Sequence, residues 1–179
     1  MRRMSVVVLA VCVMAGMFAM GTSADELVFI APVVGSNPGA TIGGVASGGA
    51  PWVVRRGIAV LTDEGRLSVD VRGLVLPSVN NTAGPITGVA ASVVCANAVV
   101  ATSGVANLSS AGDAEIHARL KVALPCVGAV VLVRVAAVNG APLPAPTAFI
   151  AATGLAAGQD NDRNDDRDHD QNDDHGHDR

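Results

Sequence analysis

The clearest pattern in the chain is an alternation of apolar and polar side chains over residues 114–122. The apolar positions are Ala114, Ile116, Ala118, Leu120 and Val122, and the positions between them carry Glu115, His117, Arg119 and Lys121. Residues 67–72 repeat the pattern, with Leu67, Val69 and Val71 each followed by a polar residue. A period of two places one face of a strand on a core and the other in water, which is typical of antiparallel sheets.

Turn signals separate such runs at short intervals. Asp63-Glu64-Gly65 lies between the predicted strands at 58–62 and 66–71 and predicts a hairpin with Gly65 in the left-handed conformation. Ala96-Asn97, residues 109–113 and Asn139-Gly140 mark further turns. No useful stretch shows helical periodicity with caps at both ends. With strands expected near 27–31 and 147–152, we predict an all-β fold, an antiparallel β-sandwich of about seven or eight short strands.

Two segments lack this regularity. Residues 35–51 hold six glycines and two prolines but match neither phosphate-loop pattern, GxxxxGK[ST] or GxGxxG. They predict a flexible surface loop. Pro142, Pro144 and Pro146 predict an extended connector outside the hydrogen-bonded ladder.

Residues 1–24 resemble a secretory signal peptide. Arg2 and Arg3 precede an apolar run at 6–20, and small residues up to Ala24 follow, which predicts cleavage after Ala24. The alternative, an N-terminal membrane anchor, needs an apolar run of about 20 residues. No later segment predicts a transmembrane helix, because Arg134 interrupts the most apolar one. We therefore expect a secreted protein, extracellular or at the cell surface, or periplasmic in a Gram-negative cell.

Signal cleavage would remove Cys12 and leave Cys95 and Cys126. Two cysteines in an oxidising compartment predict a disulfide. Closing the loop between them is worth roughly 3–4 kcal/mol in the chain-entropy model. No CxxC motif is present and no His or Asp adjoins either cysteine, so metal binding and nucleophilic catalysis are disfavoured.

Charge divides the remaining chain at residue 160. Residues 25–159, the predicted sandwich domain, carry seven acidic and seven basic side chains. Residues 160–179 carry nine Asp and three Arg, a net charge of −6, and no apolar side chain. This acidic tail is predicted to be disordered, since it has no apolar surface to bury. The overall acidity and the lack of aromatics among basic residues disfavour nucleic-acid binding.

The tail is also the candidate metal site. Its candidate ligands are His169, His175 and His177 with Asp168, Asp170 and Asp174. They favour weak association with Ca²⁺ or with Zn²⁺, Ni²⁺ or Cu²⁺. An EF-hand is rejected, because positions 6 and 12 of the loop beginning at Asp160 are Asp165 and Gln171. The alternative is a solubilising extension, and no cofactor is required by either reading.

Candidate catalytic residues are few in residues 25–159. Their one histidine, His117, is expected on the wet face of a strand, and Ser92, Ser109 and Asp113 lie in no nucleophile motif. Trp52 is expected in the core, which disfavours carbohydrate binding. The pair Arg55-Arg56 is expected on opposite strand faces, so it does not predict a continuous basic patch. The alternative is a pair at a sheet edge or a strand end that discourages edge-to-edge aggregation.

Several short runs together resemble a group of secreted bacterial β-rich proteins with no known activity, over about residues 50–155. The runs are Pro51-Trp52-Val53-Val54, Asp63-Glu64-Gly65-Arg66-Leu67, Val71-Arg72-Gly73-Leu74-Val75-Leu76-Pro77, Ala91-Ser92-Val93-Val94-Cys95, Gly112-Asp113-Ala114-Glu115-Ile116 and Leu124-Pro125-Cys126. This resemblance implies no function. We expect a non-enzymatic structural or interaction domain with an extracellular or cell-surface partner, and self-association stays open. The alternatives are metal binding through the tail and a hydrolase whose site assembles only in the fold.

Overall fold

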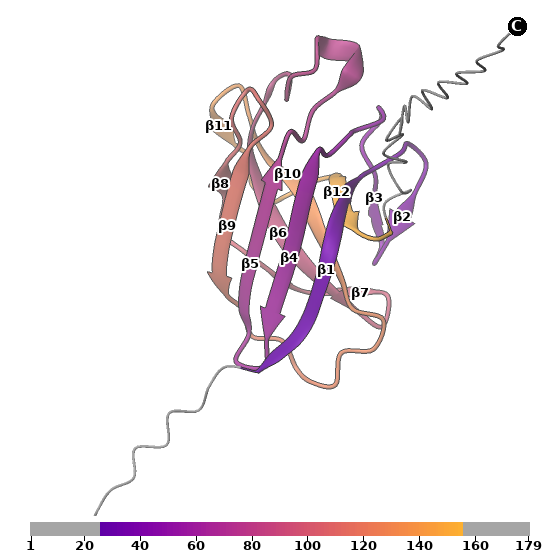
Figure 1. Cartoon of the computed structure of the whole chain (residues 1–179), viewed down its shortest axis with the longest axis vertical. Helices are drawn as coiled ribbons and strands as arrows, with labels where there is room; N and C mark the ends of the chain where they lie inside the picture. Colours follow the sequence, from indigo (N-terminus) through magenta and orange to yellow (C-terminus); the bar gives the residue numbers. More distant parts are fainter. Residues whose placement is uncertain (1–25, 156–179) are drawn as a thin grey trace, which may run out of the picture.

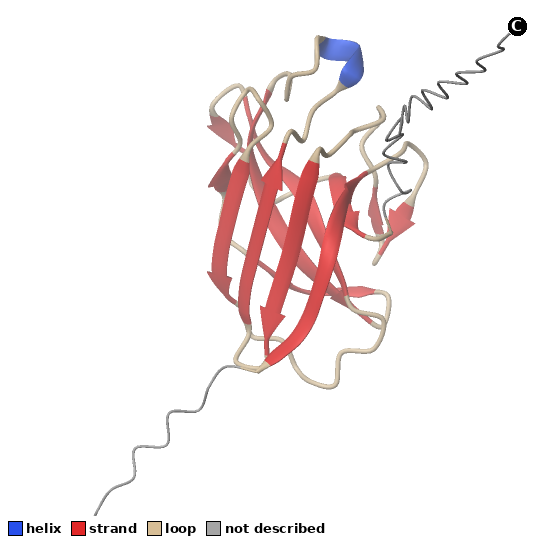
Figure 2. Cartoon of the chain, viewed as in Figure 1, coloured by secondary structure: helices blue, strands red, loops and turns tan. Residues whose placement is uncertain are grey.

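The computed structural model describes residues 26–155, which form two facing layers of antiparallel strands (Figure 1, Figure 2). Eight strands follow one hydrogen-bonded path, β7-β6-β10-β12-β1-β4-β5-β9. Their bounds are β1 Leu27–Gly35, β4 Arg56–Thr62, β5 Arg66–Arg72, β6 Ile86–Cys95, β7 Ala98–Thr102, β9 Ala114–Arg119, β10 Val130–Val138 and β12 Phe149–Thr153. The short elements are β2 Thr41–Ile42, β3 Val45–Ala46, β8 Ala106–Asn107, β11 Ala141–Pro142 and the 3-10 helix η1 Pro77–Val79. The predicted antiparallel sandwich is confirmed.

Strand β1 belongs to both layers and joins them. Its residues 27–32 pair with β4, whereas Val33, Val34 and Gly35 pair with β12. We call β9, β5, β4 and the first part of β1 the front layer, and β12, β10, β6 and β7 the back layer (Figure 1). The sandwich is therefore a single curled sheet, and β7 and β9 lie at the two ends of its path.

The core lies between the layers and follows the alternation seen in the sequence. Leu67, Val69 and Val71 of β5 and Ile116 of β9 are at most 2% exposed. The facing side chains of the back layer are Val89, Ala91 and Val93 of β6 and Val131 and Val133 of β10. Burying a valine or leucine stabilises the fold by about 1.5–3 kcal/mol, so this seam supplies much of the driving force.

The predicted turns are confirmed by their backbone angles. Gly65 closes the β4–β5 hairpin with φ +77°, after the loop residues Asp63 and Glu64. Ala96 and Asn97 both have positive φ between β6 and β7, as do Asn139 and Gly140 between β10 and β11. Two successive positive φ values are required for the tightest hairpin turn, and Asn and Gly adopt them at the lowest cost.

The glycine-rich segment 35–51 differs from the expected flexible loop. It contains the β2–β3 hairpin, which turns through Gly43 and Gly44. Ile42 and Val45 of this hairpin pack on the outer face of the back layer. They cover the buried side chains of Val94, Leu132, Phe149 and Ala152. The segment is thus part of the fold, because apolar side chains between its glycines find a second cluster to join.

Several element boundaries also differ. Strand β9 ends at Arg119 rather than Val122, although Leu120 remains buried. Strand β1 continues to Gly35, and the last strand begins at Phe149. Pro142 lies in β11 opposite Ala137, so the proline-rich connector begins with a short ladder. Proline is tolerated there because β11 pairs with a neighbour on one side only.

The predicted disulfide is confirmed. Cys95 at the end of β6 is bonded to Cys126, and their Cα atoms are 5.1 Å apart. Cys126 lies in the connection from β9 to β10, which passes from the front layer to the back layer. The bond therefore anchors this crossing to the end of β6, an inner strand of the back layer.

Two predicted segments lie outside the described residues, namely the signal peptide at 1–24 and the acidic tail at 160–179. Within residues 26–155, no helix is long and apolar enough to cross a membrane.

Candidate functional site

The two outer faces of the sandwich differ in how much of them is covered. The β2–β3 hairpin packs on part of the outer face of the back layer, where Val94 and Leu132 are at most 1% exposed. No described element lies over the outer face of the front layer, and Figure 1 shows its four strands side by side at the molecular surface. Functional side chains are therefore to be sought on the front layer.

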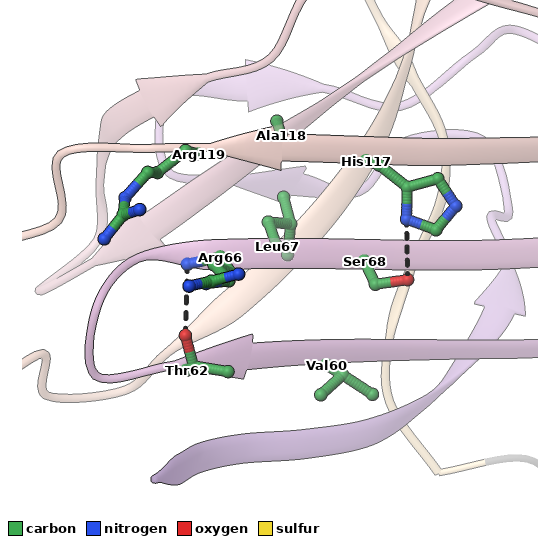
Figure 3. Close-up of a pocket in the computed structure, with 8 residues that line it drawn as sticks. All are labelled: Val60, Thr62, Arg66, Leu67, Ser68, His117, Ala118 and Arg119. Atoms are coloured by element: carbon green, nitrogen blue, oxygen red, sulfur yellow. Dashed lines mark hydrogen bonds between the residues drawn. The ribbon is translucent and has the colours of Figure 1, made fainter. Parts of the chain in front are cut away.

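A shallow groove of about 470 Å³ crosses the front layer (Figure 3). Strand β4 contributes Val60 and Thr62, β5 contributes Arg66, Leu67 and Ser68, and β9 contributes His117, Ala118 and Arg119. The β4–β5 and β5–β9 registers bring these strands together, with Val60 opposite Ser68 and Ser68 opposite His117. The groove is thus made of consecutive rungs of a regular ladder.

Ser68 and His117 form a hydrogen-bonded pair on this face, with 3.2 Å between Ser68 Oγ and His117 Nδ1 (Figure 3). Among the described residues this is the one side-chain hydrogen bond of His117. Activating a serine for acyl transfer also requires a group that orients the histidine and donors for the oxyanion. Within residues 26–155, no carboxylate bonds to His117, and Ser68 lies inside a regular strand.

The carboxylates of the front layer bind arginines instead. Arg72 Nε donates to Asp70 Oδ1 at 2.9 Å, and Arg72 also pairs with Glu115. The hydrogen bond to Asp70, and to a smaller extent that to Glu115, raises the pKa of Arg72. Arg72 thereby separates two acids, Asp70 and Glu115, that stand directly opposite each other in the ladder. At the lower end of the groove, Arg119 pairs with Glu64 at 2.5 Å.

An apolar stripe runs beside the groove along β1 and β4. Leu27 and Ile30 of β1 are 59% and 60% exposed, and Ile58 of β4 is 44% exposed. Ile30 stands opposite Val60, and Pro32 opposite Ile58, so these side chains share one face. We call Leu27, Ile30, Pro32, Ile58 and Val60 the apolar stripe. Contiguous exposed apolar side chains bordered by polar ones are typical of protein interaction sites.

The arginine pair Arg55-Arg56 differs from its prediction. Arg55 precedes β4 and lies outside the regular strand, so the opposite-face rule does not separate the two side chains. Arg55, Arg56 and Arg72 instead line one pocket of about 300 Å³. The pair lies at the start of a strand, as one alternative predicted, but not at a sheet edge, because β4 lies between β1 and β5.

The other sequence candidates are structural. Trp52 is buried in the core, as predicted. Ser92 is fully buried and hydrogen bonds to Thr102 at 2.9 Å, on the outer face of the back layer. Ser109 and Asp113 close the turn before β9, where Ser109 Oγ accepts from the Asp113 amide. The structure brings none of these residues to His117.

Arg134 of β10 holds the connection that follows β11. Its Nε donates to the Thr147 carbonyl at 2.8 Å, and the guanidinium also donates to the carbonyl of Pro146 and, at 3.4 Å, to Ser92 Oγ. Burial lowers the pKa of Arg134. No described carboxylate pairs with it, so its charge is stabilised by carbonyl and hydroxyl dipoles alone.

The predicted metal ligands, His169, His175, His177, Asp168, Asp170 and Asp174, lie outside the described residues. Within residues 26–155, no group of three or more His, Cys, Asp or Glu side chains could hold a metal ion. The Ser68–His117 pair was missed from the sequence, because its members are 49 positions apart and only the ladder register joins them.

No protein-family model matches the chain, and neither the curated proteins nor the solved structures yield a match. Its function must therefore be argued from the geometry described above.

Proposed function

We propose that this chain is a secreted, non-enzymatic domain that binds a partner protein at or outside the cell surface through the front layer. The observation that carries the proposal is the contrast between the two outer faces. Large apolar side chains of the apolar stripe are exposed on the front layer, whereas Val94, Leu132 and Phe149 of the back layer are covered by the β2–β3 hairpin. An apolar patch beside charged residues has the composition of a protein interface, with an apolar centre and a polar rim.

The shape of the front layer favours a protein over a small ligand. Small-molecule sites are concave and enclose most of their ligand, whereas this groove is a shallow trough over regular strands. The aromatic side chains of the described residues support the same choice. Trp52 and Phe149 are buried, and Phe29 packs against the core, so none offers the exposed platform that sugar binding uses.

Secretion is part of the proposal and rests on residues 1–24 together with the disulfide. A bond between Cys95 and Cys126 is compatible with an oxidising compartment, because cytosolic thiols are kept reduced. N-terminal sequencing of the exported protein tests this point. A first residue of Asp25 is expected, and retention of residues 1–24 in the extracellular or periplasmic protein would contradict signal cleavage.

A binding experiment tests the interface. The exported chain is compared with the double variant Ile30→Glu/Ile58→Glu by cross-linking in its producing culture, followed by identification of linked proteins. Val100→Glu is the matched control, because Val100 is 46% exposed and lies on β7, away from the front layer. A partner lost in the double variant and retained in the control is expected. Equal capture by all three chains would overturn the interface, and a second copy of the chain as partner would replace it with self-association.

A turnover experiment tests the non-enzymatic part. The exported chain is assayed against ester, peptide and glycoside substrates beside Ser68→Ala and His117→Ala, a half-buried and an exposed position outside the buried core. We expect the unsubstituted chain to turn over none of these substrates faster than the two variants do. Turnover that either substitution abolishes would overturn the proposal and make the Ser68–His117 pair a hydrolytic site.

A further inference from the structure

Three arginines, Arg55, Arg56 and Arg72, lie where β4 begins and β5 ends. Figure 1 shows these two strand ends in the upper part of the front layer. Arg56 and Arg72 are direct cross-strand partners, and the Arg55 amide donates to the Arg72 carbonyl at 3.1 Å. All three side chains line the pocket of about 300 Å³. We call these three residues the arginine cluster.

Residues 26–155 offset only part of the charge of the arginine cluster. Arg72 binds Asp70 and Glu115, whereas neither Arg55 nor Arg56 forms an ion pair or a side-chain hydrogen bond with a described residue. Asp113 lines the neighbouring pocket with Arg55, but its Oδ1 accepts from the Gly73 amide at 3.0 Å. Like charges directly opposite each other destabilise a strand pair by up to about 1 kcal/mol. An anion at the cluster would relieve this repulsion.

The chain itself contains a matching anion. Residues 160–179 carry nine Asp against three Arg, a net charge of −6, while residues 25–159 are neutral as a whole. Arginine donates to carboxylates in a fixed, forked geometry, so a run of aspartates offers the cluster many equivalent acceptors. The segment has no apolar side chain and can contact the sandwich only through polar and charged groups.

Strand β12 ends beside β1 and close to the start of β4, although it runs toward the other end of the front layer. Thr153 pairs with Val33, and the Gly154 amide donates to the Pro32 carbonyl at 3.1 Å. Pro32 stands opposite Ile58, which lies two positions after Arg56 in β4. With strands about 4.8 Å apart and a rise of about 3.3 Å per residue, Gly154 lies roughly 12 Å from the backbone of Arg56. A chain from residue 155 to residue 160 can span at most about 17 Å, which is long enough for the first aspartates to turn back to the cluster.

We propose that the arginine cluster binds the aspartate-rich segment 160–179 of the same chain. Each exposed ion pair contributes at most about 1 kcal/mol, so the contact exchanges readily and weakens with salt. The covalent connection compensates for the weakness of each ion pair, because a short flexible linker gives the segment an effective concentration in the millimolar range. The contact requires no fixed structure in the segment. It also requires no partner protein, so it does not rest on the proposed function.

Nuclear magnetic resonance of the exported chain tests the contact. Backbone and arginine Nε–H resonances are compared between the complete chain and one ending at Gln159, in about 10 mM salt, where the Debye length is about 30 Å. Removing the segment is expected to shift the signals of residues 55–57 and 72–73. These shifts should exceed those at basic residues elsewhere in the chain. The differences should vanish in about 1 M salt, where the Debye length is about 3 Å. Unchanged signals at these positions in low salt would overturn the proposal.

Charge variants separate a specific contact from a general attraction. A synthetic peptide of residues 160–179 is titrated into the chain ending at Gln159 and into its Arg55→Gln/Arg56→Gln variant. Arg119→Gln/Lys121→Gln is the matched control, because it removes two positive charges at the opposite end of the front layer. The peptide is expected to bind the cluster variant at least about 10-fold more weakly and the control within about 3-fold of the unsubstituted chain. Equal weakening in both variants would overturn the cluster as the site.

Inorganic phosphate forms the last arm of the titration. We expect phosphate to displace the peptide and to reverse its shifts at residues 55–57, because both ligands use the same guanidinium donors. Phosphate binding at these residues, with no shift caused by the peptide or by truncation, would overturn the assignment. The arginine cluster would then be a site for an external anion.

Discussion

The amide of Leu120 donates a hydrogen bond to the carbonyl of Gly65 at 2.7 Å, and this ties the end of β9 to the turn between β4 and β5. The backbones approach so closely that a Cβ on Gly65 would lie 2.0 Å from the Leu120 carbonyl oxygen. Gly65 also has φ +77°, a conformation that other residues adopt at a cost. Glycine is therefore required here for two separate reasons.

Replacing Gly65 with alanine tests both requirements. Gly44→Ala is the matched control, because Gly44 has φ +75° but nothing within 4 Å of its added Cβ. We expect Gly44→Ala to lower the free energy of unfolding by about 1–2 kcal/mol through backbone strain alone. Gly65→Ala should cost at least about 2 kcal/mol more, since backbone atoms must also move. Urea unfolding of the two variants measures the difference, and equal losses would contradict the close approach.

The register of β9 gives a second prediction. Ile116 is 2% exposed, whereas Glu115 lies on the outer face. Ile116→Asp buries an unpaired charge and should lower the free energy of unfolding by about 4 kcal/mol. Ile116→Ala, with a cost of about 2–5 kcal/mol, serves if the first variant does not fold. Glu115→Ala should change the free energy of unfolding by only about 0.5 kcal/mol. Similar effects at positions 115 and 116 in thermal unfolding would show that the register is wrong.

The parts of the fold that the sequence predicts are those encoded locally. The alternation in β5 and β9 and the turns at Gly65, Ala96-Asn97 and Asn139-Gly140 depend on neighbours in the chain. The partial burial of Ile42 and Val45 could not be predicted, because the cluster they pack against includes Leu132 and Phe149, about ninety and more than a hundred positions away. The glycine content of residues 35–51 therefore predicted a loop where the structure has the β2–β3 hairpin.

In the candidate site, too, the locally encoded features could be predicted and the contacts between distant residues could not. His117 was correctly placed on the wet face from its period of two, but its partner Ser68 depends on the β5–β9 register. The arginine cluster likewise requires the β4–β5 register, which sets Arg56 opposite Arg72. Neither register has a signal in a single sequence beyond the hairpin length, so sites built across strands stay hidden until the fold is known.

The disulfide gives a third prediction. Reducing the bond between Cys95 and Cys126, or replacing both residues with alanine, should lower the free energy of unfolding by roughly 3–4 kcal/mol, because the 31-residue separation restricts the unfolded chain. Urea unfolding with and without a reductant measures the effect. The double alanine variant controls for the reductant, since it should not respond to it. A response of that variant equal to that of the native chain would contradict the assignment of the effect to this bond.

Metal association with the tail stays a prediction, because His169, His175 and His177 lie outside the described residues. Isothermal titration of Ca²⁺ and Zn²⁺ into the exported chain and into a chain ending at Gln159 tests it. Weak binding by the complete chain alone is expected, since carboxylates and imidazoles are concentrated after residue 160. Identical isotherms would leave the tail as a solubilising extension.

Arg134 carries the last prediction, because its guanidinium adds side-chain hydrogen bonds to the backbone ones that hold residues 143–148 to β10. Arg134→Met keeps the length of the side chain but leaves the carbonyls of Pro146 and Thr147 and the hydroxyl of Ser92 without this donor. Partly buried acceptors without a donor cost about 1–3 kcal/mol, so we expect a loss of stability in that range.

A local measurement distinguishes this role from a general loss of stability. The amides of Leu143 and Thr147 donate to the carbonyls of Ala136 and Val135, and both should exchange with solvent faster in Arg134→Met. Lys121→Met is the control, because Lys121 is exposed and should change stability by no more than about 0.5 kcal/mol. Unchanged exchange at Leu143 and Thr147, with a uniform loss elsewhere, would show that Arg134 supports β10 itself and not the connection.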